Sequence, residues 1–251
     1  MVSTVPLPEL FQVSLNACRM KHLPFILILC LLIAVGCKKE KDREPAASDV
    51  WDIEKNGVPQ FVSTNYIEIG KIYRVSRFRS SVGHDYSDAF EHCRSMKHYF
   101  QPSDTVNWSD VKIFCPVNGK ITRVEKEWTG TKIEIVSEKY PAFWFQIFHI
   151  NMAVNLQIGD KVTEGQLLGK HVGTETYSDI SVIVNDPTHQ GRMISYFEVL
   201  TNEAFQAFVL RGITNRSAFI ISKEERDQHP LVCNGDTFVS QDPLENWVVL
   251  Q

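Results

Sequence analysis

The stretch HINMAVNLQIGDKVTEGQLLGKHVG, residues 149–173, decides the fold of this 251-residue chain. It contains two turns, each marked by a glycine, at Gly159-Asp160 and Gly165-Gln166. Glycine adopts a positive φ without steric cost and aspartate bonds to the nearby backbone, so Gly-Asp is a strong tight-turn signal. The apolar residues around these turns suit short strands with one face turned inward. They are Ile158, Val162, Leu167 and Leu168.

Further short strands are expected on both sides of this stretch. Apolar or alternating segments occupy residues 62–79, 111–124, 131–136, 143–149, 180–184 and 194–200. Within 111–124, Asn118-Gly119 is a strong hairpin signal between two strands. Short strands at regular spacing with turn residues between them predict a mostly β fold, a sandwich or barrel.

After residue 200 the pattern of apolar residues changes from that of strands to that of helices. Residues 202–212 have helical spacing of Phe205, Phe208 and Val209, and Gly212 is a natural stop. Ser222 is a suitable cap for another short helix. We therefore expect a β domain over residues 51–200 and a small helical and irregular extension over 201–251.

The N-terminus has the pattern of a secretion signal. Basic residues precede an apolar run over 25–35, which ends at Gly36-Cys37. The run is shorter than the roughly 20 apolar residues that a membrane-spanning helix needs. A basic region, a short apolar region and small residues before the junction are typical of a cleaved signal. Residues 1–37 are expected to be that signal, and the charged residues 38–50 a tether.

Ala34-Val35-Gly36-Cys37 resembles a bacterial lipobox, in which the cysteine is diacylated after cleavage. The resemblance implies lipidation at Cys37 and a place in the bacterial cell envelope, periplasmic or surface-exposed, held to the membrane by the lipid. A net charge of -4 gives no electrostatic case for nucleic-acid binding.

Three more cysteines remain after Cys37 in an oxidising compartment, so one pair can form a disulfide. Cys115 sits inside a strand-like run, whereas Cys93 and Cys233 have polar surroundings. We expect the bridge to join Cys93 and Cys233.

The order of the segments resembles the lysostaphin-like, or LytM-type, zinc endopeptidases, which cut peptide cross-bridges in peptidoglycan. The matching segments are His84-Asp-Tyr-Ser-Asp88, residues 111–121, Ile147-Phe-His149-Ile and the glycine turns of 158–173. The likeness covers residues 77–200. It implies an all-β fold called the duplicated hybrid motif, with His84 and Asp88 as metal ligands and His149 assisting catalysis.

The final His-x-His motif of that family is missing. The matching pair is either Ile194 and Tyr196 or Asp179 and Ser181, and neither register supplies the third nitrogen ligand. Catalytic zinc normally needs three protein ligands and an open position for water. The resemblance thus makes zinc possible, but the missing ligand argues against it.

Three functions remain open at this point. The first is a pseudoenzyme of the envelope, whose cleft binds or scaffolds peptidoglycan or an envelope protein. The second is an active metallohydrolase with a rearranged site built on His84, Asp88 and His149, with Asp179 also available for acid-base work. The third is a purely structural lipoprotein. Candidate binding residues are Asp85, Arg94, Lys97, His98 and Tyr196.

Overall fold

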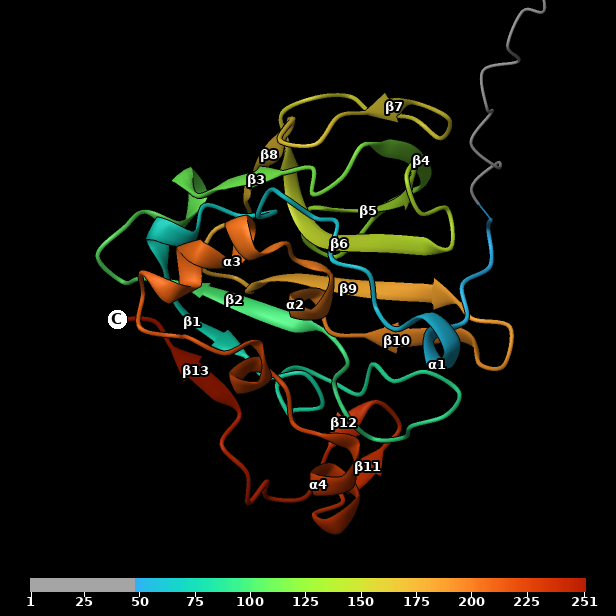
Figure 1. The fold of residues 1–251 in the computed structure, drawn as a ribbon. Coiled ribbons are helices and arrows are strands. Elements are labelled where there is room, and N and C mark those ends of the chain that lie inside the picture. The colour runs from blue at the N-terminus through green and yellow to red at the C-terminus, as the bar shows by residue number, and fades with distance from the viewer. Residues whose placement is uncertain (1–47) are drawn as a thin grey trace, which may run out of the picture. The chain divides into compact units, whose positions relative to one another are not determined.

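The structure is a computed structural model that describes residues 48–251 (Figure 1). The expected signal over 1–37, the lipobox cysteine Cys37 and most of the expected tether lie outside the described residues. Within 48–251, no helix is both long enough and apolar enough to cross a membrane.

The strands account for most of the regular structure. They are β1 (Ile72–Ser76), β2 (His98–Pro102), β3 (Lys112–Phe114), β4 (Gly119–Lys126), β5 (Thr131–Ser137), β6 (Phe143–Met152), β7 (Lys161–Val162), β8 (Leu167–His171), β9 (Ser178–Asn185), β10 (Gln190–Ile194), β11 (Cys233–Asn234), β12 (Thr237–Phe238) and β13 (Trp247–Val249).

The helices are short. They are α1 (Ile53–Asn56), η1 (Ile69–Lys71), η2 (Trp108–Asp110), α2 (Tyr196–Val199), α3 (Asn202–Val209), η3 (Arg216–Phe219) and α4 (Lys223–Gln228), where η marks a 3-10 helix.

Eleven of the strands form one antiparallel sheet, which runs in the order β13-β1-β2-β9-β6-β5-β4-β7. The sheet branches, because β8 also pairs with β6, β3 pairs with β8, and β10 pairs with β9. Strand β6 therefore has three partners and lies at the centre of the fold (Figure 1). The expected mostly β architecture is confirmed. It is of the sandwich type, and the sheet of residues 48–251 does not close into a barrel.

The two turns of residues 149–173 form as expected. Gly159 and Gly165 have φ values of 99° and 78°, which only glycine adopts readily. Asp160 accepts a hydrogen bond from the backbone N–H of Gln157 at 2.8 Å, which closes the first turn.

The hairpin expected at Asn118-Gly119 is wrong, because the strands on its two sides do not pair. β3 pairs with β8, and β4 pairs with β5 and β7. Gly119 has no positive φ. A Cβ atom there would lie 2.3 Å from the carbonyl oxygen of Val136. This glycine permits a close approach of two strands, not a tight turn.

The strand expected over 194–200 is also wrong beyond Ile194. Ser195 accepts from the N–H of Phe197, and Glu198 accepts from the N–H of Ser195, so the two form a capping box that starts α2. Ser-x-x-Glu in this segment was the sequence signal for the helix.

Residues 201–251 pack into the same core as the sheet. Phe205 and Phe208 of α3 and Phe219 of η3 are buried with the sheet residues, and Phe219 stacks on Phe197 at 3.7 Å. Helices α3 and α4 begin and end close to the expected residues, with Thr201 and Ser222 as their caps. Strand β13 pairs with β1, so the chain ends as part of the main sheet.

Candidate functional site

His149 lies at an irregularity of β6, where its pairing with β5 is interrupted. Thr131 pairs with Ile150 and Ile133 with Ile147, so β6 carries one extra residue at this point. A bulge of this kind redirects side chains and is common beside functional sites. His149 has a φ of 56°, which is uncommon for a residue with a Cβ atom. Its N–H donates to Glu127 Oε2 at 3.1 Å, which supports the bulge.

The bulge forms one wall of a cleft of about 380 Å³. The loop and strand over residues 83–99 contribute Gly83, His84, Tyr86, Lys97 and Tyr99. The β4–β5 hairpin, β6 and the loop before β9 contribute Glu127, Trp128, Lys132, Phe148, His149 and Thr176. The cleft thus brings together the predicted residues His84, Lys97 and His149.

Lys97 lies between His84, a predicted metal ligand, and Asp179, a predicted catalytic residue. Its Nζ donates to Asp179 Oδ2 at 2.8 Å and lies 3.5 Å from His84 Nε2. His84 Nδ1 donates to the carbonyl of Asp85 at 2.9 Å, so Nε2 presents a lone pair to the ammonium in the neutral ring. The Nζ atom also lies over the rings of Tyr86 and Phe148, at 4.2 and 3.8 Å from their centroids.

Asp179 projects from β9 beside Phe148 of β6 and is fully buried. Its Oδ1 has no hydrogen-bond partner and lies 3.8 Å from His149 Nε2. In the register of Asp179 and Ser181, Asp179 contacts the cleft residue Lys97, and Ser181 turns its hydroxyl to Gln146 at 3.1 Å. In the register of Ile194 and Tyr196, Ile194 ends β10 and Tyr196 begins α2, and both side chains are buried.

His149 contacts two acids. Its Nδ1 lies 3.0 Å from Glu127 Oε2, and its Nε2 faces Asp179. Burial disfavours the charged ring, but the hydrogen bond to Glu127 and the charge of Asp179 outweigh it and raise the pKa of His149. Burial acts against the charged form of Glu127 as well, and the bond from His149 nevertheless lowers its pKa. The arrangement favours a charged imidazole next to a charged carboxylate.

Asp85 and Asp88 do not point into the cleft. Asp88 accepts from the N–H groups of Phe90 and Glu91 through Oδ1 and from Met193 N–H through Oδ2. Asp85 accepts from the backbone of the 93–94 segment and from a serine hydroxyl. Both carboxylates fix the loop that carries His84.

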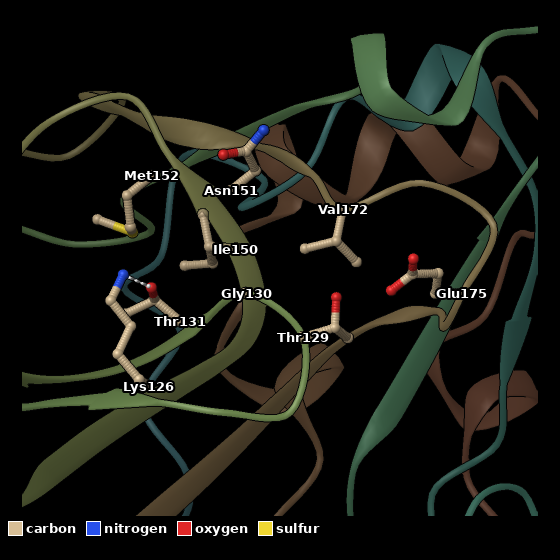
Figure 2. A pocket seen from close by; sticks show the side chains of 9 residues that line it. All are labelled: Lys126, Thr129, Gly130, Thr131, Ile150, Asn151, Met152, Val172 and Glu175. Carbon is tan, nitrogen blue, oxygen red and sulfur yellow. Dashed lines mark hydrogen bonds between the residues drawn. The ribbon is translucent and has the colours of Figure 1, made fainter.

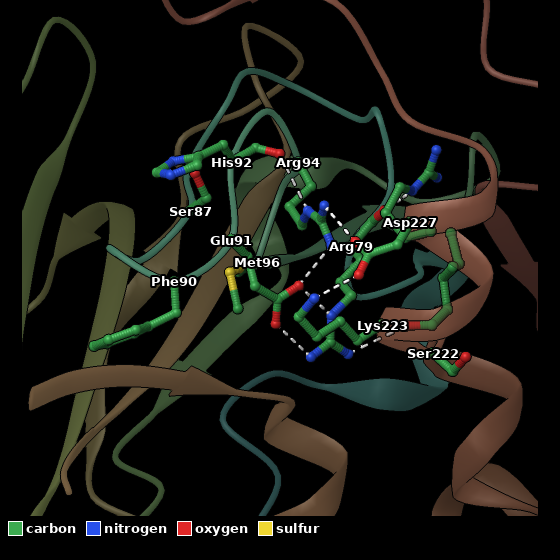
Figure 3. Close-up of polar contacts among 12 residues, drawn as sticks. Arg79, Ser87, Phe90, Glu91, His92, Arg94, Met96, Ser222, Lys223 and Asp227 are labelled. Atoms are coloured by element: carbon green, nitrogen blue, oxygen red, sulfur yellow. Dashed lines mark hydrogen bonds and ion pairs between the residues drawn. The ribbon is translucent and has the colours of Figure 1, made fainter. Parts of the chain in front are cut away.

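Arg94 also holds this loop. Its guanidinium pairs with Glu91 at 2.7 Å and with Asp227 of α4 at 3.0 Å (Figure 3). Arg79 bonds the same Glu91 carboxylate at 2.7 Å, so Glu91 ties this loop to Arg79, and Arg94 ties it to α4 (Figure 3).

His98 and Tyr196 belong to the core. His98 Nδ1 donates to Ser76 O and its Nε2 accepts from Ser195 Oγ, both at 2.8 Å. Burial lowers the pKa of His98 to about 4, so the ring is neutral at physiological pH. The Tyr196 hydroxyl accepts from the N–H of Tyr66 at 3.1 Å.

The predicted disulfide between Cys93 and Cys233 is confirmed. It joins the loop that carries His84 to the β11–β12 hairpin. Cys115 is free and buried, and its thiol donates to the carbonyl of Val117.

The residues of this cleft do not fit a zinc ion. Across residues 48–251, no three His, Cys, Asp or Glu side chains are arranged to hold a metal. Asp88 is bonded to backbone amides, Ser181 faces Gln146, and the ammonium of Lys97 stands between His84 and Asp179. A protonated lysine has donors only and cannot act as a ligand.

A second cavity of about 330 Å³ is lined in part by other residues of the hairpin that carries Trp128. Lys126, Thr129 and Glu175 line it, and Lys126 Nζ donates to Thr131 Oγ1 at 2.9 Å (Figure 2). The turn over 127–130 therefore contributes residues to both cavities.

Several cleft residues were absent from the sequence prediction. They are Tyr86, Glu127, Trp128, Lys132 and Thr176. Glu127 and Trp128 had a signal in the sequence, because they stand shortly before Gly130, a residue typical of turns. A tryptophan at a turn does not pack into the core, so it is available for binding. Trp128 is 72% exposed.

No family model and no curated protein matches this sequence. Solved structures with a similar fold include peptidases of the LytM and lysostaphin type. Csd3 of Helicobacter pylori has 17% identity and a TM-score of 0.41, with 57% of this chain and 34% of Csd3 covered.

The catalytic domain of lysostaphin, an antimicrobial peptidase from Staphylococcus simulans, has 15% identity and a TM-score of 0.32. That match covers 47% of this chain and 84% of the lysostaphin domain. A protein designated lytM from Ruminococcus gnavus has 18% identity and a TM-score of 0.34, with 44% and 46% covered. This chain spans less than half of the Csd3 and R. gnavus structures. The likeness is one of fold, and the function below is supported by the site itself.

Proposed function

We propose that this chain is a pseudoenzyme of the bacterial cell envelope, whose peptidase-like domain binds peptidoglycan or an envelope protein without cleaving it. The observation that carries the proposal is the state of the predicted metal ligands. His84 faces the ammonium of Lys97, which also bonds the predicted catalytic residue Asp179, and Asp88 is bonded to three backbone N–H groups. Without a metal, no activated water is available from this set.

The cleft offers features that suit a peptide with a carboxylate. Lys132 and a charged His149 supply positive charge at its wall, and the exposed ring of Trp128 supplies an apolar contact. The Trp128 ring lies 5.6 Å from the ring of His149, so the two form a continuous surface. Rigid aromatic rings beside charged groups are the usual anchors of binding sites.

The proposed attachment follows the sequence: a signal over 1–37, a lipid on Cys37 and a tether over 38–50. The domain over 51–200 would stand at the membrane surface, with 201–251 packed against it. Incorporation of labelled palmitate into the wild-type protein, and its loss in Cys37→Ala, tests this attachment.

An active hydrolase is the second candidate, favoured by the pairing of His149 with Glu127 and its approach to Asp179. An imidazole between two carboxylates can move protons without a metal. The rearranged zinc site would additionally require Asp88 to leave its backbone partners.

Cosedimentation with purified peptidoglycan tests the proposal, with release of soluble fragments measured in the same tubes. We expect the wild-type protein to cosediment and to release nothing, and Trp128→Ala to bind about tenfold more weakly. Leu210→Ala is the matched control, because Leu210 is 78% exposed and lies outside the cleft.

Fragment release that His149→Ala abolishes would establish the hydrolase instead. Absence of cosedimentation would reject peptidoglycan as the ligand.

A further inference from the structure

The chain enters the domain beside the turn that joins β5 to β6. The N–H of Trp51 donates to Asn185 O at 3.0 Å, and its ring meets the ring of Tyr140 edge-on, with the centroids 5.3 Å apart. Asn185 ends β9, and its N–H donates to Ala142 O at 2.9 Å. The segment before residue 48 therefore joins the domain at this end of the sheet (Figure 1).

Three lysines project from the same end of the sheet. Lys120 of β4 and Lys161 of β7 are cross-strand partners, and Lys139 lies in the β5–β6 turn. All three are exposed, and within residues 48–251 none of them forms an ion pair. The surface that they share, which we call the entry face, consists of residues 119–120, 136–141 and 157–161. Its acids are Glu138 and Asp160, so the lysines outnumber them.

A hollow of about 320 Å³ lies between β4, β7 and the β5–β6 turn. Lys120 and Lys161 line it together with the apolar side chains of Val136 and Pro141. Cations around an apolar floor suit a ligand that carries a negative group on an apolar body.

An exposed apolar side chain stands beside these cations. Ile158 is 70% exposed, at the tip of the turn over 157–160. The turn is held in place by Ile121, which accepts from the N–H of Gly159 and donates to Asp160 O, both at 2.9 Å. A Cβ atom at Gly159 would lie 3.9 Å from Lys120 Cε, so this lysine runs alongside the turn. Apolar and basic side chains on one surface suit the boundary between lipid headgroups and acyl chains.

The entry face and the cleft lie at opposite ends of the same strands. Strand β5 begins at Thr131 on the cleft side and ends at Ser137 on the entry face. Strand β6 runs the other way, from Phe143 to His149 in the cleft and beyond. Six steps along β6, at about 3.3 Å each, separate the two surfaces by roughly 20 Å.

We propose that the entry face docks on a membrane of anionic phospholipids, with its lysines on the headgroup phosphates and Ile158 among the headgroups. The inference deepens the proposed function and rests on its attachment through Cys37. From Cys37 to Ser48 the chain spans at most about 40 Å, so a lipid on Cys37 keeps the entry face close to the membrane. Docking there turns the cleft away from the membrane, towards the cell wall that holds the proposed ligand.

Cosedimentation of residues 45–251 with lipid vesicles tests the docking. This part of the chain is a compact unit with a hydrophobic core of its own, so it folds without the lipid anchor. We expect it to bind vesicles of mixed phosphatidylglycerol and phosphatidylcholine, and not phosphatidylcholine alone. High salt should release it. Lys120→Ala/Lys161→Ala should bind roughly thirtyfold more weakly, because each lysine at an anionic surface contributes about fivefold.

Lys112→Ala/Lys170→Ala is the matched control. Lys112 and Lys170 are also an exposed cross-strand pair, formed by β3 and β8. Lys170 pairs with Asn151, beyond His149, so this pair lies at the cleft end of β6. The control carries the same change of charge and should bind the vesicles as the unchanged chain does.

A polarity-sensitive dye tests the orientation on the same vesicles. On Ile158→Cys its emission should shift to the blue when phosphatidylglycerol vesicles are added, because the residue enters the headgroup region. On Trp128→Cys, in the cleft wall, the emission should not change. Cys115 is buried and does not compete for the dye.

Equal binding to both kinds of vesicle, binding to neither, or an equal loss in the control pair would overturn the inference. A blue shift at position 128 without one at position 158 would also contradict it. The proposed function fails separately, since peptidoglycan cosedimentation and palmitate on Cys37 do not depend on the lysines of the entry face.

Discussion

Removing the disulfide between Cys93 and Cys233 is expected to destabilise the protein strongly, because the bridge closes a very long loop. The two cysteines are 140 residues apart in the sequence. In the chain-entropy treatment, a cross-link over this length restricts the unfolded chain by about 5 kcal/mol. Natural disulfides usually contribute about 2 to 5 kcal/mol, so we expect Cys93→Ser/Cys233→Ser to lose about 3 to 5 kcal/mol.

The folded state of the double variant should persist, because other contacts hold the same two segments together. Asp85 N–H donates to Asp236 O at 2.6 Å, and Arg94 pairs with Asp227. For a protein of this size, the expected loss corresponds to a fall in Tm of roughly 10 °C.

Urea unfolding at neutral pH measures the effect. Reductant should destabilise the wild-type protein by a similar amount and leave the double variant unchanged. Cys115→Ser is the control for loss of a thiol, since Cys115 is free. A loss below about 1 kcal/mol, or an undiminished effect of reductant on the double variant, would refute the entropic reasoning.

Three further predictions concern the buried charges and the close approach of strands. Lys97→Met and Asp179→Asn should each lower the free energy of unfolding by about 3 to 5 kcal/mol in urea, because each leaves one buried charge without its partner. The double variant should lose much less than the sum of the two. The pKa of His98 is about 4 in the fold and 6.5 in the unfolded chain, so below pH 6.5 the unfolded chain binds a proton that the folded protein does not. The free energy of unfolding should therefore fall by roughly 2 to 3 kcal/mol between pH 6.5 and 4.5. His98→Gln should show a shallower loss over the same range. Gly169→Ala should lower the free energy of unfolding by about 2 to 3 kcal/mol, because its Cβ would lie 2.2 Å from a carbonyl oxygen of β6. Gly70→Ala is the control: its Cβ would meet nothing within 4 Å, so this variant should be nearly neutral in the same unfolding assay.

The elements that follow from local chemistry could be predicted from the sequence. Gly159 and Gly165 need positive φ values, and Ser222 caps a helix through its own hydroxyl. These turns and this helix start therefore do not depend on residues far away in the sequence. Asn118-Gly119 has the same local signal as a hairpin turn. It fails because Gly119 is required for contact with Val136 of the neighbouring strand, which no local pattern reveals.

The site was less predictable because its residues are defined by partners far away in the sequence. Asp88 matches a metal-ligand position, yet the amide of Met193, 105 residues away, fixes its carboxylate outside the cleft. Lys97 was a candidate binding residue, and its ammonium instead pairs with Asp179 of the same chain. A motif supplies the residue type, and the fold decides which lone pairs remain free.

Zinc titration of the wild-type protein after chelator treatment tests the central claim most directly. Calorimetry should detect no stoichiometric site, because Lys97 already engages His84 and Asp179. One tightly bound zinc per chain that disappears in His84→Ala would contradict the account and would establish a metal centre in this cleft.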